Sequence, residues 1–535
     1  MDSAFPVVLT VLLCSCGPTK TAEPADLPTD SGTRDEAETD SGTFTPEGPR
    51  AELGPTRPCV APLESVHWTE MGAASGLPVR PDDGRPTEEA TYLVVDDFDL
   101  DGDLDLLTSV FGLSEPGFPE PVTVHTWVED HFETTPLDVE ALWQPTLGDV
   151  DGDGDRDVIL AGSDSWLDND DGVLVKSTLE GIDAERWPFT RMFAPIDLNH
   201  DGHLDLYGAT THPDGDADAM QDYIAWGQSD GRFEIDPNAH PSTDGGMAFD
   251  AQWLDWAGDG QPEIYVANDQ GYSHGANKLW SWDDPAPYNQ APAVHADLAH
   301  DAMGVDAADW NGDGQPDLYL SANVANVLLV SQPDGTLVDM TMVSKANPML
   351  GLSSPILMGW GGVFADHNND GQPDLMVTLG DWWTEPGGPR PEMNLHLLQS
   401  NGDQFDDVGE ALGIDAQGSF RGVVARDFNH DGVLDFMVST VFGAPLWFVS
   451  DGCTAEHWVE IQAPDSSHIT ITAGDTTQVG WASTSSGFGA AAIPVAHFGL
   501  GDNDTIDHVE VVLPGGAVWR TDAPLESRRR IIVRP

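Results

Sequence analysis

The sequence predicts an all-β fold, namely a seven-bladed β-propeller followed by a small C-terminal β-domain. One short acidic motif occurs seven times, at intervals of about 55 residues, which is typical of a chain built from repeated supersecondary units. Within each interval, short runs rich in β-branched and aromatic residues alternate with turn residues such as Pro-Asp-Gly. Because four antiparallel strands make one propeller blade, seven such intervals predict seven blades.

The N-terminus predicts export. Residues 4–13 (AFPVVLTVLL) are apolar but too short to span a bilayer. The sequence LCSC at residues 13–16, which begins at the last residue of this segment, resembles a bacterial lipobox. Cys16 follows the small Ser15 and is the predicted lipidated residue, so residues 1–16 form the predicted lipoprotein signal peptide. An ordinary cleaved signal, giving a secreted protein, is the alternative. Gly17 favours the bacterial outer membrane or cell surface by resemblance to known sorting rules.

Residues 17–58 predict a disordered acidic tether, because Thr, Pro, Asp, Glu, Ser and Gly dominate them and cannot bury a core. Residues 59–453 follow as the predicted propeller and residues 454–535 as the C-terminal β-domain.

The repeated motif has the pattern D-x-D-x-D-G-x-x-D, first seen in DDFDLDGDLDLL at residues 96–107. Two carboxylates about 4 Å apart repel by roughly 4 kcal/mol at an effective dielectric constant near 20, so such a cluster favours capture of a cation. Ligation by oxygen alone indicates Ca²⁺. Thr108 stands where an EF-hand needs Glu, and a strand-like run follows, so we expect the loop to precede a strand. A solvated acidic turn is the alternative, but it gives no reason for seven copies in register.

Six copies predict about six Ca²⁺ sites, with side chains at positions 1, 3, 5 and 9 and a backbone carbonyl at position 7 as ligands. In chain order these residues are Asp97, Asp99, Asp101, Asp103 and Asp105; Asp149, Asp151, Asp153, Asp155 and Asp157; Asp197, Asn199, Asp201, His203 and Asp205; Asp309, Asn311, Asp313, Gln315 and Asp317; Asp366, Asn368, Asp370, Gln372 and Asp374; and Asp427, Asn429, Asp431, Val433 and Asp435. The fourth copy in the chain is predicted to be weak or empty, because Ala257 replaces an oxygen ligand and leaves Asp255, Asp259 and Glu263.

These motifs carry a family resemblance over about residues 60–535. The repeats resemble the FG-GAP or VCBS repeats of integrin-α-type propellers, and the tail, with TQVGWAST, SGFGAA and HFGLGDNDTIDHVEVVLPGG, resembles the ASPIC/UnbV domain. The combination is similar to the cartilage acidic protein type, which implies a calcium-binding exported protein that is not an enzyme. One departure is the Asn-Arg-Gly-rich stretch of that domain, which is reduced here to APDSSHITIT.

The chain has 21 Lys and Arg against 92 Asp and Glu, a net charge of -71, which excludes nucleic acid as a partner. The acidity favours solubility and is compatible with a saline habitat. The sequence lacks the GxSxG, P-loop, HExxH and CxxC signatures, which supports a non-enzymatic role.

Two histidines and several tryptophans invite specific expectations. His200 and His430, at position 4 of their loops, are expected to point to solvent, and Trp310 is expected to pack between blades. The Trp382–Trp383 pair and Trp280 with Trp282 are expected in longer loops, where they could offer aromatic platforms to sugars or partner proteins.

The last blade lacks a fourth strand before the C-terminal domain begins. Residues 63–71 (LESVHWTEM) have the sequence pattern of the missing fourth strand. We therefore expect them to pair with residues 445–450 and close the ring. Cys59 and Cys453 flank these segments and are the cysteines that remain after Cys14 is removed and Cys16 is lipidated. In an exported protein this predicts a disulfide, with two buried free thiols as the alternative.

Three functions remain open at this point. The first is a calcium-stiffened, surface-anchored module for adhesion or protein interaction, held at the membrane only through lipid. The second is a glycan-binding lectin that uses the tryptophans. The third is an accessory biosynthetic protein of the UnbV type, which rests on fold analogy alone.

Overall fold

The computed structural model describes residues 48–79, 90–111, 121–182, 189–211, 221–236, 246–282, 287–349, 357–381 and 393–535. The predicted signal peptide, Cys16 and residues 17–47 of the predicted tether lie outside these residues. Everything below concerns the compact unit Gly48–Pro535.

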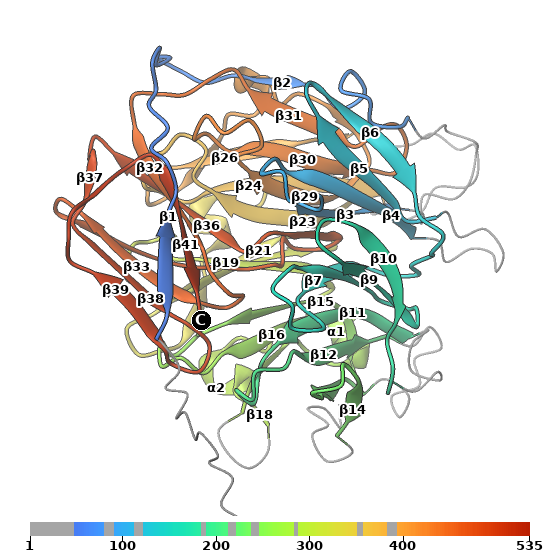
Figure 1. Ribbon diagram of the computed structural model, residues 1–535. Helices are drawn as coiled ribbons and strands as arrows, with labels where there is room; N and C mark the ends of the chain where they lie inside the picture. Colours follow the sequence, from blue (N-terminus) through green and yellow to red (C-terminus); the bar gives the residue numbers. More distant parts are fainter. Residues whose placement is uncertain are drawn as a thin grey trace, which may run out of the picture. The chain divides into compact units, whose positions relative to one another are not determined.

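In the described ranges, seven sheets each contain a set of four antiparallel strands (Figure 1). In six of the sets the strands follow one another in the chain, or nearly so, and in the seventh the outermost strand comes from near the start of the described residues. We call them sheets one to seven. Their strands are, in order, β3 (Ala90–Asp96), β4 (Asp105–Phe111), β5 (Thr123–Val128) and β6 (His131–Pro136); β7 (Pro145–Gly148), β8 (Asp157–Leu160), β9 (Ser165–Asn169) and β10 (Leu174–Thr178); β11 (Thr190–Ile196), β12 (Asp205–Thr210), β13 (Tyr223–Gly227) and β14 (Phe233–Ile235); β15 (Met247–Leu254), β16 (Glu263–Asp269), β17 (Lys278–Ser281) and β18 (Tyr288–Asn289); β19 (Ala302–Ala308), β20 (Asp317–Ala322), β21 (Val327–Ser331) and β22 (Leu337–Asp339); β23 (Leu357–Ala365), β24 (Asp374–Asp381), β26 (His396–Ser400) and β27 (Phe405–Asp407); and β29 (Phe420–Arg426), β30 (Asp435–Thr440), β31 (Leu446–Ser450) and β2 (Trp68–Glu70).

The first strands of neighbouring sheets contact one another in a closed series. β3 contacts β7, the contacts continue through β11, β15, β19, β23 and β29, and β29 contacts β3 again. The second strand β20 (DLYLSA) is buried at all six residues, and its three central residues, LYL, form a short apolar run. The all-β class is confirmed. That the sheets are seven blades of one propeller stays a prediction, which the closed series supports.

Sheet seven closes with a strand from the other end of the chain. β2 pairs with β31, with Trp68 opposite Ser450 and Glu70 opposite Phe448, and the indole of Trp68 donates a hydrogen bond to the Leu434 carbonyl (3.0 Å). Residues 63–71 therefore pair with 445–450 as predicted, although the strand itself is shorter than that range. The closure is confirmed.

The predicted disulfide is also confirmed. Cys59 and Cys453 are bonded, with their Cα atoms 5.8 Å apart. Beside the bond, the Leu63 N–H donates to the Cys453 carbonyl (2.9 Å), so the two ends of the predicted propeller are joined by covalent and hydrogen bonds.

The C-terminal domain consists of two four-stranded sheets that enclose their own apolar core. One sheet contains β32 (His457–Gln462), β36 (Val495–Gly501) and β41 (Arg529–Arg534), and the other contains β33 (His468–Ala473), β34 (Thr476–Trp481), β38 (His508–Val512) and β39 (Val518–Thr521). Shorter elements of the unit are β25 (Met393–Asn394), β28 (Gln417–Gly418), β37 (Thr505–Ile506), β40 (Leu525–Glu526), α1 (Gly271–His274), α2 (Ala291–Val294), α3 (Thr341–Ser344) and the 3₁₀ turn η2 (Glu410–Leu412). Within the described residues, no helix has the length and apolarity needed to cross a membrane.

One part of the predicted tether is ordered. β1 (Arg50–Leu53) pairs antiparallel with β41 and so completes the first sheet of the C-terminal domain (Figure 1). For these residues the expectation of disorder was wrong, because the β41 edge offers unpaired backbone groups that a strand can satisfy.

The C-terminal domain also sends a segment into sheet one. β35 (Ala490–Ala492) pairs in parallel with β3, and Phe488 just before it contacts the rings of Tyr92, Phe249 and Trp360, which come from sheets one, four and six. Gly422 in β29 permits the approach, since a Cβ there would lie 2.7 Å from the Gly489 carbonyl oxygen. Phe488 thus fills space between first strands of separate sheets.

Candidate calcium loops

Each acidic motif forms the link between the first and second strand of its sheet. The residue at position 4 has positive φ in every copy, and so has the glycine at position 6, whose φ lies between 82° and 105°. Glycine adopts this conformation at little cost, which explains its place in the motif. The residues at position 4 are Leu100, Gly152, His200, Gly258, Gly312, Asn369 and His430, and those at position 6 are Gly102, Gly154, Gly202, Gly260, Gly314, Gly371 and Gly432.

The tight turn directs carboxylates inward, and the same three hydrogen bonds occur in all seven copies. The position 6 N–H donates to the carboxylate at position 1, the position 7 N–H donates to the carboxylate at position 5, and the position 2 N–H donates to the acid at position 9. In the first copy these bonds are Gly102 to Asp97 (3.0 Å), Asp103 to Asp101 (3.0 Å) and Phe98 to Asp105 (2.9 Å). The loop geometry therefore brings the predicted ligands at positions 1 and 5 close to the acid at position 9.

The acid at position 9 begins the second strand and is buried. In six sheets its other oxygen accepts an N–H from the third strand, as Asp317 does from Ser331 (2.8 Å). The fourth loop differs, because the longer Glu263 side chain instead lies near the Ser281 hydroxyl (3.3 Å) and the Gln290 amide (3.4 Å). The prediction that this loop is weak or empty stays a prediction.

The buried acids carry an unfavourable charge in the absence of a counter-ion. Burial, with neighbouring carboxylates, raises the pKa of Asp105 and Asp317 to about 7 and the pKa of Asp157 and Asp435 to about 8. Burial likewise raises the pKa of Asp205 to about 6 and that of Glu263 to about 7. A bound dication would restore the ionised form of each.

The donor chemistry fits Ca²⁺. In the first loop, Asp97, Asp99 and Asp105 place carboxylate oxygens within 4.8 Å of one another, and in the second loop Asp149, Asp151 and Asp153 do the same. Ca²⁺ accepts 6–8 oxygens at 2.3–2.6 Å in flexible geometry, which carboxylates and carbonyls of such a loop can supply. Loops with Asn at position 3 carry one negative charge fewer than loops with Asp there. The Asn amide donates to the position 5 carboxylate, as Asn311 does to Asp313 (3.0 Å).

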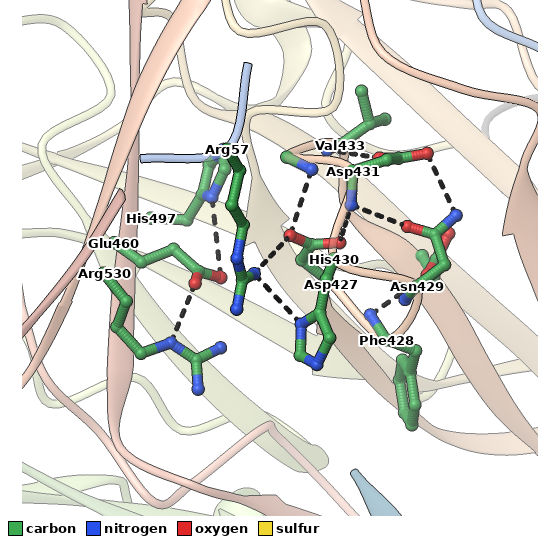
Figure 2. A network of polar contacts seen from close by, with 12 residues as sticks. Arg57, Asp427, Phe428, Asn429, His430, Asp431, Val433, Glu460, His497 and Arg530 are labelled. Carbon is green, nitrogen blue, oxygen red and sulfur yellow. Dashed lines mark hydrogen bonds and ion pairs between the residues drawn. The ribbon is translucent and has the colours of Figure 1, made fainter. Parts of the chain in front are cut away.

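The seventh loop is embedded in a polar network (Figure 2). Arg57, from the segment before Cys59, places Nη1 3.0 Å from Nδ1 of His430 and 3.6 Å from Oδ2 of Asp427. His430 also contacts the Gly102 carbonyl of the first loop (3.2 Å) through Nε2. The expectation that His430 points to solvent was wrong, because its side chain lies between the first and seventh loops.

Residues at position 4 connect other loops as well. His200 is exposed as expected, but its Nε2 lies 3.1 Å from Oε1 of Gln261, at position 7 of the fourth loop. The Asn369 amide donates to the Gly432 carbonyl (2.8 Å), which connects the sixth loop with the seventh. The sequence signal for these contacts is a His or Asn at a left-handed position where glycine is the commoner solution.

The C-terminal domain covers several of these loops. The Trp481 indole donates to the Asp255 carbonyl (3.3 Å), and the Gly515 N–H donates to the Gly260 carbonyl (2.9 Å), both in the fourth loop. In the sixth loop, the Gly501 N–H donates to the Asn369 carbonyl (2.9 Å). Predicted calcium loops and the C-terminal domain therefore share a contact surface, which sequence reasoning did not foresee.

The tryptophans divide into confirmed and overturned expectations. Trp310 donates to the Ser400 hydroxyl (2.9 Å) and stacks on Phe405, so it packs between sheets five and six as predicted. Trp280 lies in β17 and is buried, and Trp282 packs partly buried against Tyr207 and Trp253, so neither offers a free platform. The Trp382–Trp383 pair lies outside the described residues.

Comparison with known families agrees with the repeat pattern and with the tail. The FG-GAP-like repeat matches residues 149–208 and 255–320, and the ASPIC and UnbV domain matches residues 466–532. The chain carries FG-GAP-like repeats and an ASPIC and UnbV domain. Together, an FG-GAP-like propeller repeat and this domain indicate a surface interaction module. No curated protein sequence matches the chain.

Several solved structures show a low similarity to this chain. An Agrocybe aegerita lectin that recognises non-reducing terminal N-acetylglucosamine is 12% identical, with 71% of this chain and 93% of that chain covered and a TM-score of 0.40. BBS1N, in complex with ARL6DN, is 10% identical, with 72% and 98% covered and a TM-score of 0.39. The V. cholerae biofilm matrix protein Bap1 is 12% identical, with 88% and 65% covered and a TM-score of 0.27. These likenesses are too weak to indicate what this chain binds.

Proposed function

We propose that this protein is a calcium-binding interaction module at the bacterial cell surface, anchored through lipid on Cys16 and not an enzyme. The observation that carries the proposal is the sevenfold loop, in which carboxylates converge and the acid at position 9 is buried. Among the described residues, basic side chains contact loop acids in the sixth loop, where His367 meets Asp374, and in the seventh, where Arg57 lies near Asp427. Such clusters favour a hard dication, and Ca²⁺ is abundant outside cells. Bound Ca²⁺ would stiffen the loops that connect the first two strands of each sheet.

A surface location is supported by two features of the chain. The N-terminal pattern around Cys16 resembles a lipobox, and the Cys59–Cys453 disulfide suits an oxidising compartment. Membrane fractionation tests the anchor. Wild-type protein should partition with the outer membrane, whereas the Cys16→Ala variant should be released in soluble form; partition that is unchanged by the substitution would contradict lipidation.

Calcium binding is tested by isothermal titration calorimetry of chelator-treated protein. We expect about six ions per chain, with an Asp309→Asn variant losing one site. The matched control is Asp255→Asn, in the loop predicted to be weak, which should leave the count unchanged. A count of zero, or equal effects of the two substitutions, would contradict the assignment.

The interaction role is tested by affinity capture from outer-membrane extracts with Ca²⁺ present. Specific partners should be retained with Ca²⁺ and released by chelator. Retention of the same proteins by the Asp309→Asn and wild-type chains after chelation would show that calcium has no part in recognition.

A further inference from the structure

The side chain at position 4 connects one calcium loop with the next at two places in the closed series of sheets. In the sixth loop, Nδ2 of Asn369 donates to the Gly432 carbonyl, at position 6 of the seventh loop (2.8 Å). In the seventh loop, Nε2 of His430 lies 3.2 Å from the Gly102 carbonyl, at position 6 of the first loop. Both contacts run from position 4 of one loop to position 6 of the following loop, so the sixth, seventh and first loops form one chain of contacts.

The contact of the seventh loop with the first has a defined direction, which Arg57 sets. A guanidinium can only donate, and Nη1 of Arg57 lies 3.0 Å from Nδ1 of His430 (Figure 2). Nδ1 is therefore an acceptor, and Nε2 of the neutral imidazole carries the hydrogen that the Gly102 carbonyl accepts. The same nitrogen lies 3.3 Å from Oδ1 of Asp103, so it has two acceptors of the first loop within reach.

The carbonyl that accepts each contact belongs to a peptide group next to predicted ligands. This group joins positions 6 and 7, and position 7 supplies the backbone carbonyl of the predicted coordination. Its N–H donates to the position 5 carboxylate, as Val433 does to Asp431 (2.8 Å) and Asp103 does to Asp101 (3.0 Å). The C=O of the peptide group is thus held by the neighbouring loop and its N–H by a predicted ligand, which links the conformations of the two loops.

The residue types at position 4 support a role for the side chain. Asn369 and His430 both have a φ of 61°. Glycine adopts this conformation at the lowest cost, and it occupies position 4 in the second, fourth and fifth loops. The turn itself therefore needs no side chain there. Asn369 is 1% exposed, so its amide is packed against the seventh loop and not left in solvent.

The first and fifth loops differ from this pattern. Leu100, at position 4 of the first loop, has no hydrogen-bonding group in its side chain. The first loop instead meets the second through Arg156, at position 8 of the second loop, which donates to both carboxylate oxygens of Asp96 (2.5 and 2.7 Å). The fifth loop has Gly312 at position 4, so it cannot make a position 4 side-chain contact and serves as an internal reference.

We propose that calcium binding is coupled along the sixth, seventh and first loops, with Asn369 and His430 as the positioning residues that connect them. An ion in one loop orders its turn and thereby fixes the group that contacts the neighbouring loop, so filling one loop favours filling the next. The inference rests on the calcium binding proposed above and adds regulation of that binding. Coupling between two sites typically changes affinity by about 5- to 150-fold, and it acts equally in both directions.

Through-space charge predicts the opposite sign. A bound dication repels a second one, so electrostatic repulsion alone would make each filled loop weaken binding in its neighbours. If repulsion dominates, removal of the seventh site should tighten binding in the first and sixth loops. If the hydrogen bonds dominate, the same change should weaken it. The direction of the change in affinity therefore distinguishes the two effects.

The test is a Ca²⁺ titration of the full chelator-treated chain, followed by hydrogen exchange and mass spectrometry. Peptides that cover residues 97–105, 309–317 and 366–374 report the calcium midpoints of the first, fifth and sixth loops separately. Asp427→Asn removes a predicted ligand of the seventh loop. We expect it to raise the midpoints of the first and sixth loops about 5-fold or more and to leave that of the fifth loop unchanged.

Two substitutions of His430 test the contact itself. His430→Gly keeps the left-handed turn and should raise the midpoint of the first loop, with that of the sixth nearly unchanged. His430→Gln keeps an N–H donor at a similar reach and should restore the wild-type midpoint. The matched control is His200→Gly, at position 4 of the third loop, because its partner Gln261 lies in the loop predicted to be weak or empty. This control should leave all three midpoints unchanged.

Several results would overturn the coupling. Unchanged or lower midpoints of the first and sixth loops in Asp427→Asn would do so while leaving calcium binding intact, as would equal effects of His430→Gly and His200→Gly. Bound ions counted by calorimetry without any change in exchange would show that binding does not order the loops. A calorimetric count of zero would overturn calcium binding and the coupling together. Melting temperatures distinguish a lost contact from a lost fold, and His430→Gly carries the test if Asp427→Asn unfolds.

Discussion

Replacing one calcium-loop aspartate should change stability in opposite ways with and without Ca²⁺. Asp309, at position 1 of the fifth loop, is 7% exposed and accepts the N–H groups of Asp313 and Gly314, each at 2.9 Å. Asn at this position keeps an acceptor but loses a negative charge. With dissociation constants of about 10⁻⁴ M and millimolar Ca²⁺, each occupied loop stabilises the fold by roughly 1.4 kcal/mol, and six loops by about 8 kcal/mol.

Differential scanning calorimetry should therefore show that Asp309→Asn lowers the melting temperature by a few degrees at most in 1 mM Ca²⁺. In chelator the same substitution should be neutral or stabilising, because it removes a like charge from an unfilled cluster. Chelation of the wild type should lower its melting temperature by roughly 8 °C, because the unfolding entropy of a unit of this size is about 1 kcal/mol/K. Asp255→Asn is the control and should leave the melting temperature in Ca²⁺ nearly unchanged. Equal destabilisation by Asp309→Asn in both buffers would refute the reasoning, since it would show that the carboxylate supports only the turn.

Three further predictions concern pH, the disulfide and the seventh loop. Burial raises the pKa of Asp157 and Asp435 to about 8, so the folded calcium-free protein binds protons more tightly than the unfolded chain. Its stability should therefore fall as the pH rises from about 4 to about 8, and bound calcium should reduce this dependence. Melting temperatures at pH 5 and pH 8, with and without calcium, measure the effect. Cys59→Ser should lower the free energy of unfolding in urea titrations by about 2–5 kcal/mol relative to oxidised wild type, and wild type in reductant should match the variant. Equal unfolding midpoints of the variant and oxidised wild type would contradict a stabilising disulfide. Arg57→Ala should tighten calcium binding at the seventh loop, because the guanidinium beside Asp427 opposes a second cation; titration showing weaker binding would reverse this interpretation.

Features encoded by local chemistry could be predicted from the sequence. The loop positions follow from glycine, which tolerates positive φ, and from acids at fixed spacing. The closing strand at Trp68 and the Cys59–Cys453 bond could be predicted because one repeat lacked a strand and the remaining cysteines flanked the gap.

Features that depend on long-range packing could not. β1 and β35 are short, and their partners lie hundreds of residues away, so no local pattern specifies the pairing of Arg50 with Arg534 or of Leu93 with Ala490. Trp280 was misplaced for a different reason. In KLWSW the apolar residues can be read as a loop or as a strand, and burial against sheet three decided the outcome.

The disulfide has a mechanical consequence for a chain pulled from its N-terminal end. Tension entering at Gly48 meets first the four-residue pairing of β1 with β41, which is short enough to detach under modest force. It then reaches Cys59, where the covalent bond transfers it directly to Cys453, before the chain arrives at β2. The strand that completes sheet seven is thereby shielded from strain, so β1 can detach under load while β2 keeps its pairing with β31.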